Sequence, residues 1–272
     1  MSVIRIENLT RDYGDGKGVF DVSFHVNQGE AFGFLGPNGA GKTTTIRHLM
    51  GFLKPKSGKC MIDELECWKD RDKIQSRLGY IPGEISFFDD MTGIEFLQFI
   101  AKYRKISTIN RQKELLERFE LDPKGKIKKM SKGMKQKIGI VAAFMHNPDI
   151  LILDEPTSGL DPLMQSRFIE LVEEEKKHGR TILMSSHIFE EVERTCDRVG
   201  IIRKGKLAAV DSVEALRERH VRSYTVTLDS AELANAFAKD FGGRSDGQKV
   251  TVSTKQSLEE IFMNYYGGEK ND

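Results

Sequence analysis

Alternation of apolar and polar residues predicts antiparallel strands at the start of the chain. Ile4 and Ile6 share one face, and a glycine-rich turn follows. The alternation then resumes, with one face made of Phe20, Val22, Phe24 and Val26. This period of two is typical of half-buried strands. Residues 31–35 form an unbroken apolar run, which instead predicts a strand covered on both faces.

A helical period replaces the alternation over residues 92–147. Apolar residues recur there at helix spacing in three groups: Ile94, Phe96, Leu97, Phe99 and Ile100; Leu115, Leu116 and Phe119; Ile138, Val141, Ala142 and Met145. Apolar runs predict further strands at 77–81, 150–153, 181–184 and 199–203, with an amphipathic helix at 165–177. We therefore expect an α/β core with a parallel sheet and an inserted helical block at about 85–147.

The pattern changes after residue 210. Asp229-x-x-Glu232 and Ser257-x-x-Glu260 match the capping box that opens a helix. Residues 224–228 and 249–253 alternate as strands. The chain is therefore predicted to have a core over residues 1–210 and a small α+β extension over residues 211–272.

Composition narrows the classes of partner. The 272 residues include 42 basic and 41 acidic ones, for a net charge of +1. This balance provides no global field to hold a nucleic acid, so we expect no nucleic-acid partner. The three cysteines form no CxxC pair, which favours reduced cytosolic thiols over a zinc site or a disulfide framework. No apolar run reaches the roughly 18 to 20 residues that span a bilayer, so a membrane function would need a span from another chain.

Residues 36–43 match the phosphate-loop pattern G-x-x-x-x-G-K-[ST] between the buried strand and a helix. The residues of this loop are Gly36, Pro37, Asn38, Gly39, Ala40, Gly41, Lys42 and Thr43. Glycines let successive N–H groups turn toward phosphate oxygens, helped by the positive end of the helix. We expect Lys42 to reach the β- and γ-phosphates of a nucleotide and the Thr43 hydroxyl to ligate Mg²⁺, with Thr44 beside them.

Two further strands end in polar residues that complement this loop. Asp154 and Glu155 follow the strand at 150–153, at the sheet edge where open α/β sheets bind ligands. Asp154 is predicted to hold the magnesium, and Glu155 to polarise a water for attack on the γ-phosphate. His187 follows the strand at 181–184 and can hydrogen-bond the γ-phosphate; alone, such a histidine is more often an ordinary surface residue.

Taken together, these motifs closely resemble the ATP-binding subunits of ABC transporters. The phosphate loop, Ser131-Lys-Gly133-Met-Lys-Gln136, Leu-Asp154-Glu155-Pro-Thr-Ser-Gly-Leu-Asp161 and Ser186-His187 occur in that family's order and approximate spacing, over about residues 2–210. The resemblance implies a P-loop NTPase core with an antiparallel β subdomain and an inserted helical subdomain. It also implies that Tyr13 stacks on adenine and that Asp161 orders a subunit interface.

Two positions depart from the family pattern. The signature segment, usually Leu-Ser-Gly-Gly-Gln, is Met130-Ser-Lys-Gly-Met134 here; Ser131, Gly133 and Met134 are expected to bind the nucleotide of an opposite subunit, and Ser131 can also serve as a plain helix cap. After the strand at 77–81 the family commonly has a glutamine that contacts Mg²⁺. Gly83 stands there and Glu84 follows, so Glu84 as a metal ligand stays an open alternative.

The resemblance implies an ATPase that dimerises around two MgATP and drives a separate integral-membrane permease, most similar in motifs to bacterial exporters. Such a subunit lies on the cytoplasmic face of the membrane, held by its permease. The second subunit is either another copy or a related chain. The apolar loop from Ile85 to Met91 either receives the permease or packs on the helical block. An alternative function is a soluble ABC-type ATPase that acts as a mechanical switch; a phosphoryl-transferring kinase leaves the signature segment and Asp161 without a role.

Overall fold

A computed structural model describes residues 1–88, 90–219 and 221–267 of the chain. The chain divides into two compact units, Met1–Val210 and Asp211–Asp272. Within the described ranges, no helix combines the length and apolar character needed to cross a bilayer.

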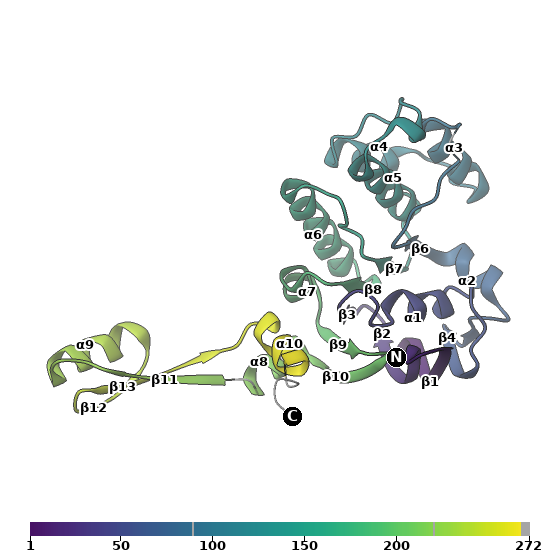
Figure 1. The fold of residues 1–272 in the computed structure, drawn as a ribbon. Helices are drawn as coiled ribbons and strands as arrows, with labels where there is room; N and C mark the ends of the chain where they lie inside the picture. The colour runs from purple at the N-terminus through teal and green to yellow at the C-terminus, as the bar shows by residue number, and fades with distance from the viewer. Residues whose placement is uncertain (89, 220, 268–272) are drawn as a thin grey trace. The chain divides into compact units, whose positions relative to one another are not determined.

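Two sheets form the larger unit (Figure 1). The antiparallel sheet has the order β2 (Lys17–Asn27), β1 (Ser2–Gly14), β4 (Ser57–Ile62) and β5 (Leu65–Glu66). The second sheet has the order β10 (Lys206–Ser212), β9 (Arg198–Arg203), β3 (Ala31–Leu35), β8 (Thr181–Ser186), β7 (Ile150–Asp154) and β6 (Leu78–Ile81). Its strands from β9 to β6 pair in parallel, which confirms the predicted α/β class.

Helices cover both faces of the parallel sheet because its strands are apolar on both sides. Helix α1 (Lys42–Leu49) contacts β2 and β4 of one sheet and β7 of the other, and its buried Ile46 and Leu49 join a core shared by both sheets. Helix α7 (Phe189–Thr195) contacts β3 and β8, and α6 (Pro162–Lys177) contacts α7. The short helix α2 (Arg71–Arg77) precedes β6.

The predicted helical block is present between β6 and β7 (Figure 1). It consists of α3 (Gly93–Tyr103), α4 (Asn110–Arg118), the 3₁₀ turn η1 (Ile127–Lys129) and α5 (Lys132–Phe144). Helix α3 starts with a capping box between Thr92 and Glu95. Helix α5 contacts α3, α4 and the core strand β6, so it joins the block to the sheet.

The smaller unit has a three-stranded antiparallel sheet in the order β11 (Val221–Thr227), β13 (Lys249–Lys255) and β12 (Arg244–Asp246). Helix α9 (Ala231–Phe241) packs on it around Ala234, Ala238 and Val250. Helices α8 (Val213–Arg219) and α10 (Leu258–Gly267) contact each other. The predicted capping box at Ser257 and Glu260 is confirmed by two hydrogen bonds, of 3.1 and 3.2 Å.

Two local predictions were wrong. Phe20 is only half-buried, and Val19 takes the inward position, because β2 has a bulge where Asp21 adopts a φ of +55°. The residue that caps α9 is Ser230, whose hydroxyl accepts the Leu233 N–H at 3.2 Å, and not Asp229. Aspartate and serine are both favoured helix N-cap residues, so only the backbone geometry distinguishes the two positions.

Candidate functional site

Glycines shape the loop between β3 and α1. Gly39 and Gly41 have φ values of +80° and +113°, a region that residues with a Cβ rarely adopt. A Cβ on Gly41 would also lie 2.8 Å from Cγ1 of Val19. The loop leads directly into α1, where Thr43 and Thr44 lie half-buried in the first turn. The structure therefore has the predicted glycines followed by a helix N-terminus, and phosphate binding there stays a prediction.

The ammonium group of Lys42 is held inside the loop. Its Nζ donates to the carbonyl oxygens of Gly36 and Pro37 at 2.5 and 3.2 Å. It also forms an ion pair with Oε1 of Glu155 at 3.0 Å. The side chain is only 5% exposed, so the charged ammonium group lies inside the loop and not in the solvent.

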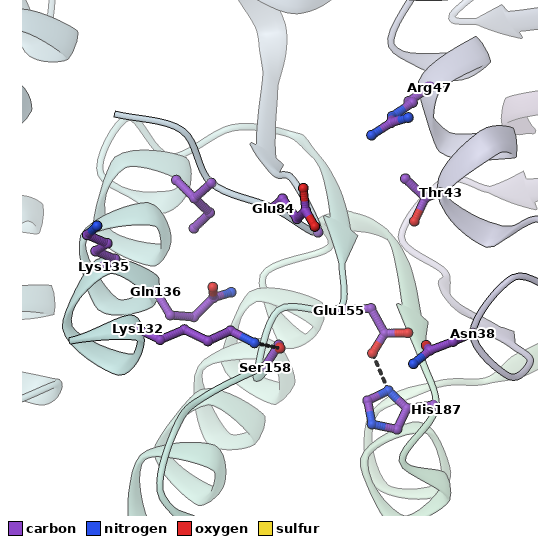
Figure 2. A pocket seen from close by; sticks show the side chains of 12 residues that line it. Asn38, Thr43, Arg47, Glu84, Lys132, Lys135, Gln136, Glu155, Ser158 and His187 are labelled. Atoms are coloured by element: carbon purple, nitrogen blue, oxygen red, sulfur yellow. Dashed lines mark hydrogen bonds and ion pairs between the residues drawn. The ribbon is translucent and has the colours of Figure 1, made fainter. Parts of the chain in front are cut away.

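Glu155 lies between Lys42 and His187. It follows β7 directly, with a φ of +49°, and its backbone N–H donates to the Ser185 hydroxyl at 3.1 Å. One carboxylate oxygen pairs with Lys42, and the other makes a short hydrogen bond with Nδ1 of His187. Figure 2 shows the imidazole and the carboxylate facing each other across the two loops. The structure thus brings together the predicted proton acceptor and the predicted histidine.

Asp154 is fully buried at the end of β7. Its Oδ1 accepts the Ser185 hydroxyl at 2.5 Å, whereas Oδ2 has no hydrogen-bond partner among the described residues. Burial raises the pKa of this carboxyl, and the nearby hydroxyls of Ser185 and Thr43 act in the opposite direction. A buried carboxylate oxygen that lacks a donor, beside a threonine hydroxyl, is a suitable pair of protein ligands for Mg²⁺.

The usual coordination of Mg²⁺ is compatible with Asp154 and Thr43 as its protein ligands. Within the described part of the chain, no group of three or more His, Cys, Asp or Glu residues is placed to hold a metal. Mg²⁺ typically takes one or two carboxylates together with phosphate oxygens and waters, so a larger protein cage is not required. Thr43 and Asp154 therefore fit a magnesium that is shared with a nucleotide.

Gly83 lies directly beside these candidate ligands. A Cβ added to it would lie 3.0 Å from Oδ2 of Asp154 and 3.8 Å from the Thr43 hydroxyl oxygen. A side chain longer than glycine therefore projects onto the candidate metal position. In this chain the space is left open, and the carboxylate of Glu84 lines the same cleft. Its role as a ligand stays a prediction.

The signature segment contacts the loop that follows Glu155. Ser131 caps α5 by accepting the Met134 N–H at 3.2 Å, as its alternative interpretation predicted. The Lys132 ammonium donates to the Ser158 hydroxyl at 2.8 Å, and Gln136 donates to the Pro156 carbonyl at 2.6 Å. A Cβ on Gly133 would lie 2.7 Å from the carbonyl oxygen of Gly159, so glycine is needed for this close approach.

An open cleft of about 590 Å³ joins these elements (Figure 2). Five of the residues that line it were predicted as site residues from the sequence: Asn38, Thr43, Glu84, Glu155 and His187. Sequence reasoning assigned no role in this cleft to Arg47, Ile85, Lys132, Lys135, Gln136 and Ser158. Arg47 follows Thr43 by one helical turn, a spacing that could have identified it. The others lie in segments that the motifs had already marked, but their side-chain directions depend on the packing of α5 against the core.

Several predicted residues are not among those that line the cleft, and Tyr13 and Asp161 are two of them. Tyr13, near the end of β1, is 52% exposed, and the Arg11 guanidinium lies 5.3 Å from its ring centroid. Asp161 caps α6 by accepting the Met164 N–H at 3.0 Å. Both are exposed, and neither lines the cleft.

Comparisons with known proteins give matches in both sequence and structure. A sequence profile of the ABC transporter family matches residues 19–158. The linearmycin resistance ATP-binding protein LnrL of Bacillus subtilis (strain 168) is 36% identical over 92% of this chain and 82% of its own length. The bacitracin transport ATP-binding protein BcrA of Bacillus licheniformis is 41% identical over 80% of this chain and 72% of its own length. A solved ATP-binding subunit of an ABC transporter has a TM-score of 0.77 and 28% identity, and the match covers 97% of this chain and 99% of that one.

Proposed function

This chain belongs to the ABC transporter family as an ATP-binding and ATP-hydrolysing subunit, and we propose that it closes with a second subunit around two MgATP to drive a separate membrane permease. In this proposal residues 1–210 are the ATPase domain, and residues 211–272 are an accessory extension. The second subunit is a copy of this chain or a related one. The subunit is peripheral, on the cytoplasmic face, and is held there by the permease.

The position of Ser131 is the main observation in support of the dimer. Ser131 is exposed at the N-terminus of α5, and it is not among the residues that line the cleft with Glu155 and His187. The start of this helix is therefore accessible to a ligand that another subunit holds. A helix start binds phosphate well, so it can complete the site of a nucleotide held by the other subunit. Asp161, which is also exposed, is assigned to the same interface.

The residues of the cleft have distinct roles in this mechanism. Lys42 leaves the carbonyls of its loop for the β- and γ-phosphate oxygens. Glu155 accepts a proton from the attacking water, and His187 holds the Glu155 carboxylate and the γ-phosphate. Thr43 and Asp154, with Glu84 as a further candidate, hold the Mg²⁺, which neutralises charge on the transferred phosphate. Tyr13 stacks on adenine from its exposed position on β1.

Light scattering of the Glu155→Gln variant tests the dimer. Without the proton acceptor the closed complex hydrolyses its nucleotide only slowly, so MgATP should shift the mass from monomer to dimer. Adding Ser131→Arg places a bulky side chain at the helix start and should abolish the shift while ATP binding persists. A Glu155→Gln chain that binds MgATP yet stays monomeric at all protein concentrations contradicts the two-subunit site.

Export is the proposed direction of transport. Two relatives are named for linearmycin resistance and bacitracin transport, and both align over most of this chain. Resistance to an antibiotic is consistent with its removal from the cell. We extend to this chain only the direction, and not the identity of the cargo.

An apolar groove on the larger unit is the proposed permease contact. It has a volume of about 250 Å³ and includes Phe52, Tyr80 and Phe87 in its lining. Phe52 is 51% exposed and packs edge-on against Tyr80 at 5.9 Å. In the loop after β6, Phe87 packs edge-on against Phe96 of α3 at 4.9 Å, so part of this loop is used for internal packing.

Replacing Phe52 by serine tests the groove. Because the side chain is half exposed, we expect folding and basal ATPase activity of the isolated chain to change little. Co-purification with the permease should fall markedly, since the exposed phenyl ring is the contact that a helix would bury. The control is Phe241→Ser, which removes a similarly exposed ring from the smaller unit. Equal permease recovery with both variants contradicts the assignment of the groove.

A further inference from the structure

The carboxylate of Glu191 bridges the two loops that carry Glu155 and His187. Glu191 lies on α7 and is 3% exposed. The Thr157 hydroxyl donates to its Oε1 at 2.5 Å, and the Ser186 hydroxyl donates to its Oε2 at 2.8 Å. Thr157 is two residues after Glu155, and Ser186 immediately precedes His187. One buried side chain thus holds both loops at the sheet edge.

The bridge is anchored to the core. The Thr195 hydroxyl donates to the Glu191 carbonyl oxygen at 2.6 Å, which ties the helix turn together. Helix α7 lies tightly on β3, because a Cβ on Gly33 would lie 2.5 Å from a methyl carbon of Val192. Strand β3 leads directly into the phosphate loop. The carboxylate therefore has a fixed position relative to the phosphate-binding residues as well.

The charge of Glu191 is costly to bury. Among the described residues no lysine or arginine forms an ion pair with it, and its partners are the two hydroxyls. Burial raises its pKa, and the two hydroxyl donors act in the opposite direction. An apolar residue at this place would fill the volume at lower cost, but it would connect neither loop.

We propose that Glu191 is a positioning residue that keeps the Glu155 carboxylate and the His187 imidazole in contact by fixing the loops on which they stand. The inference rests on the proposed function, in which these two residues act on the attacking water and the γ-phosphate. A positioning residue acts on turnover, because small displacements of a proton acceptor slow the chemical step strongly. It should have little effect on ATP binding, which depends on Lys42 and the phosphate loop.

Steady-state hydrolysis by the Glu191→Ala and Glu191→Gln variants of the full chain tests the proposal. Alanine should lower kcat by about 10- to 100-fold with KM for ATP nearly unchanged. Glutamine keeps the length and can still bond both hydroxyls, so it should restore most of the rate. Thr157→Val and Ser186→Ala each remove one donor and should each lower kcat with KM preserved, which keeps the test decisive if the alanine variant folds poorly.

Glu175 provides the matched control. It is 4% exposed on α6, but it pairs with Arg111 at 2.5 Å and lies outside the cleft. Glu175→Gln should lower the melting temperature without lowering kcat of the folded protein. If the Glu191 variants lose only melting temperature, as this control does, or lose kcat and ATP affinity in parallel, Glu191 is merely structural and the proposal is wrong.

A double variant separates this proposal from the proposed function. If Glu191 acts through Glu155, Glu191→Ala should not slow the residual hydrolysis of Glu155→Gln any further. A further loss of the same size as in the wild-type background overturns the positioning role. If Glu155→Gln alone hydrolyses ATP at the wild-type rate, the proposed function fails instead, irrespective of what Glu191 does.

Discussion

Replacing Glu155 by glutamine is expected to slow ATP hydrolysis by about 10²- to 10⁴-fold, the range that general-base catalysis contributes. The side chain follows β7 in a constrained backbone conformation, with a φ of +49°, and is 16% exposed. Glutamine keeps the shape of the side chain but cannot accept the proton of the attacking water. The loss should therefore fall on kcat.

The same variant should bind MgATP at least as tightly as the wild-type chain. The Glu155 carboxylate pairs with Lys42 at 3.0 Å, and this pair competes with the phosphate oxygens for the same ammonium group. A neutral amide weakens that competition. Equilibrium titration with MgATP measures the effect separately from phosphate release.

Glu84→Gln is the control for Glu155→Gln, because it removes the other carboxylate of the cleft but keeps an oxygen ligand. It should retain most of its turnover. If Glu155→Gln hydrolyses ATP as fast as the wild-type chain, Glu155 is not the proton acceptor. If it loses ATP binding together with turnover, the carboxylate contributes to the nucleotide site itself, and the assigned role is wrong.

Local sequence patterns predicted the parts of this fold that depend on neighbouring residues. The phosphate loop and the strand that ends at Asp154 are contiguous motifs, and the structure places them together at one sheet edge. The helices of the inserted block were predicted because apolar residues recur at helix spacing over long segments. The short helices α2 and α7 span only seven residues each, so no amphipathic period develops that would reveal them.

Contacts between distant segments could not be predicted in the same way. Lys132 meets Ser158 across 26 positions of the sequence, and Glu191 meets Thr157 across 34. Each contact depends on how a helix packs against the core, which the period of a single segment does not determine. The open space beside Gly83 could not be predicted either, because the residues around a glycine determine how much room its lack of a side chain leaves.

Replacing Asp154 by asparagine is expected to abolish magnesium-dependent hydrolysis and to make the folded chain more stable. The side chain is fully buried, and its Oδ2 has no hydrogen-bond partner among the described residues. Loss of the anionic ligand should reduce turnover by at least about 100-fold, since even outer-shell partners of a metal contribute 10- to 100-fold. Magnesium should also lose its ability to tighten ATP binding.

The gain in stability follows from the direction of the pKa shift. Burial raises the pKa of Asp154 in the folded protein above the unfolded value of 3.8, so the ionised carboxylate opposes folding at neutral pH. Asparagine removes this cost, and about 1 kcal/mol raises the melting temperature by about 2 to 4 °C in a chain of this size. The gain should shrink as the pH falls through the folded-state pKa, because the wild-type aspartate then becomes neutral as well.

Thermal unfolding without MgATP measures the stability of the Asp154→Asn chain, and thermal unfolding with MgATP measures how well the chain binds its ligand. The control is Asp149→Asn, at the other end of β7. Asp149 is exposed and pairs with Arg180, so its replacement should lower the melting temperature slightly and leave turnover intact. A lower melting temperature for Asp154→Asn would show that the carboxylate stabilises the fold. If MgATP raises the melting temperature of this variant as much as that of the wild-type chain, Asp154 is not a ligand of the metal. A site residue that costs stability when its ligand is absent is expected where binding, and not packing, has determined the choice of side chain.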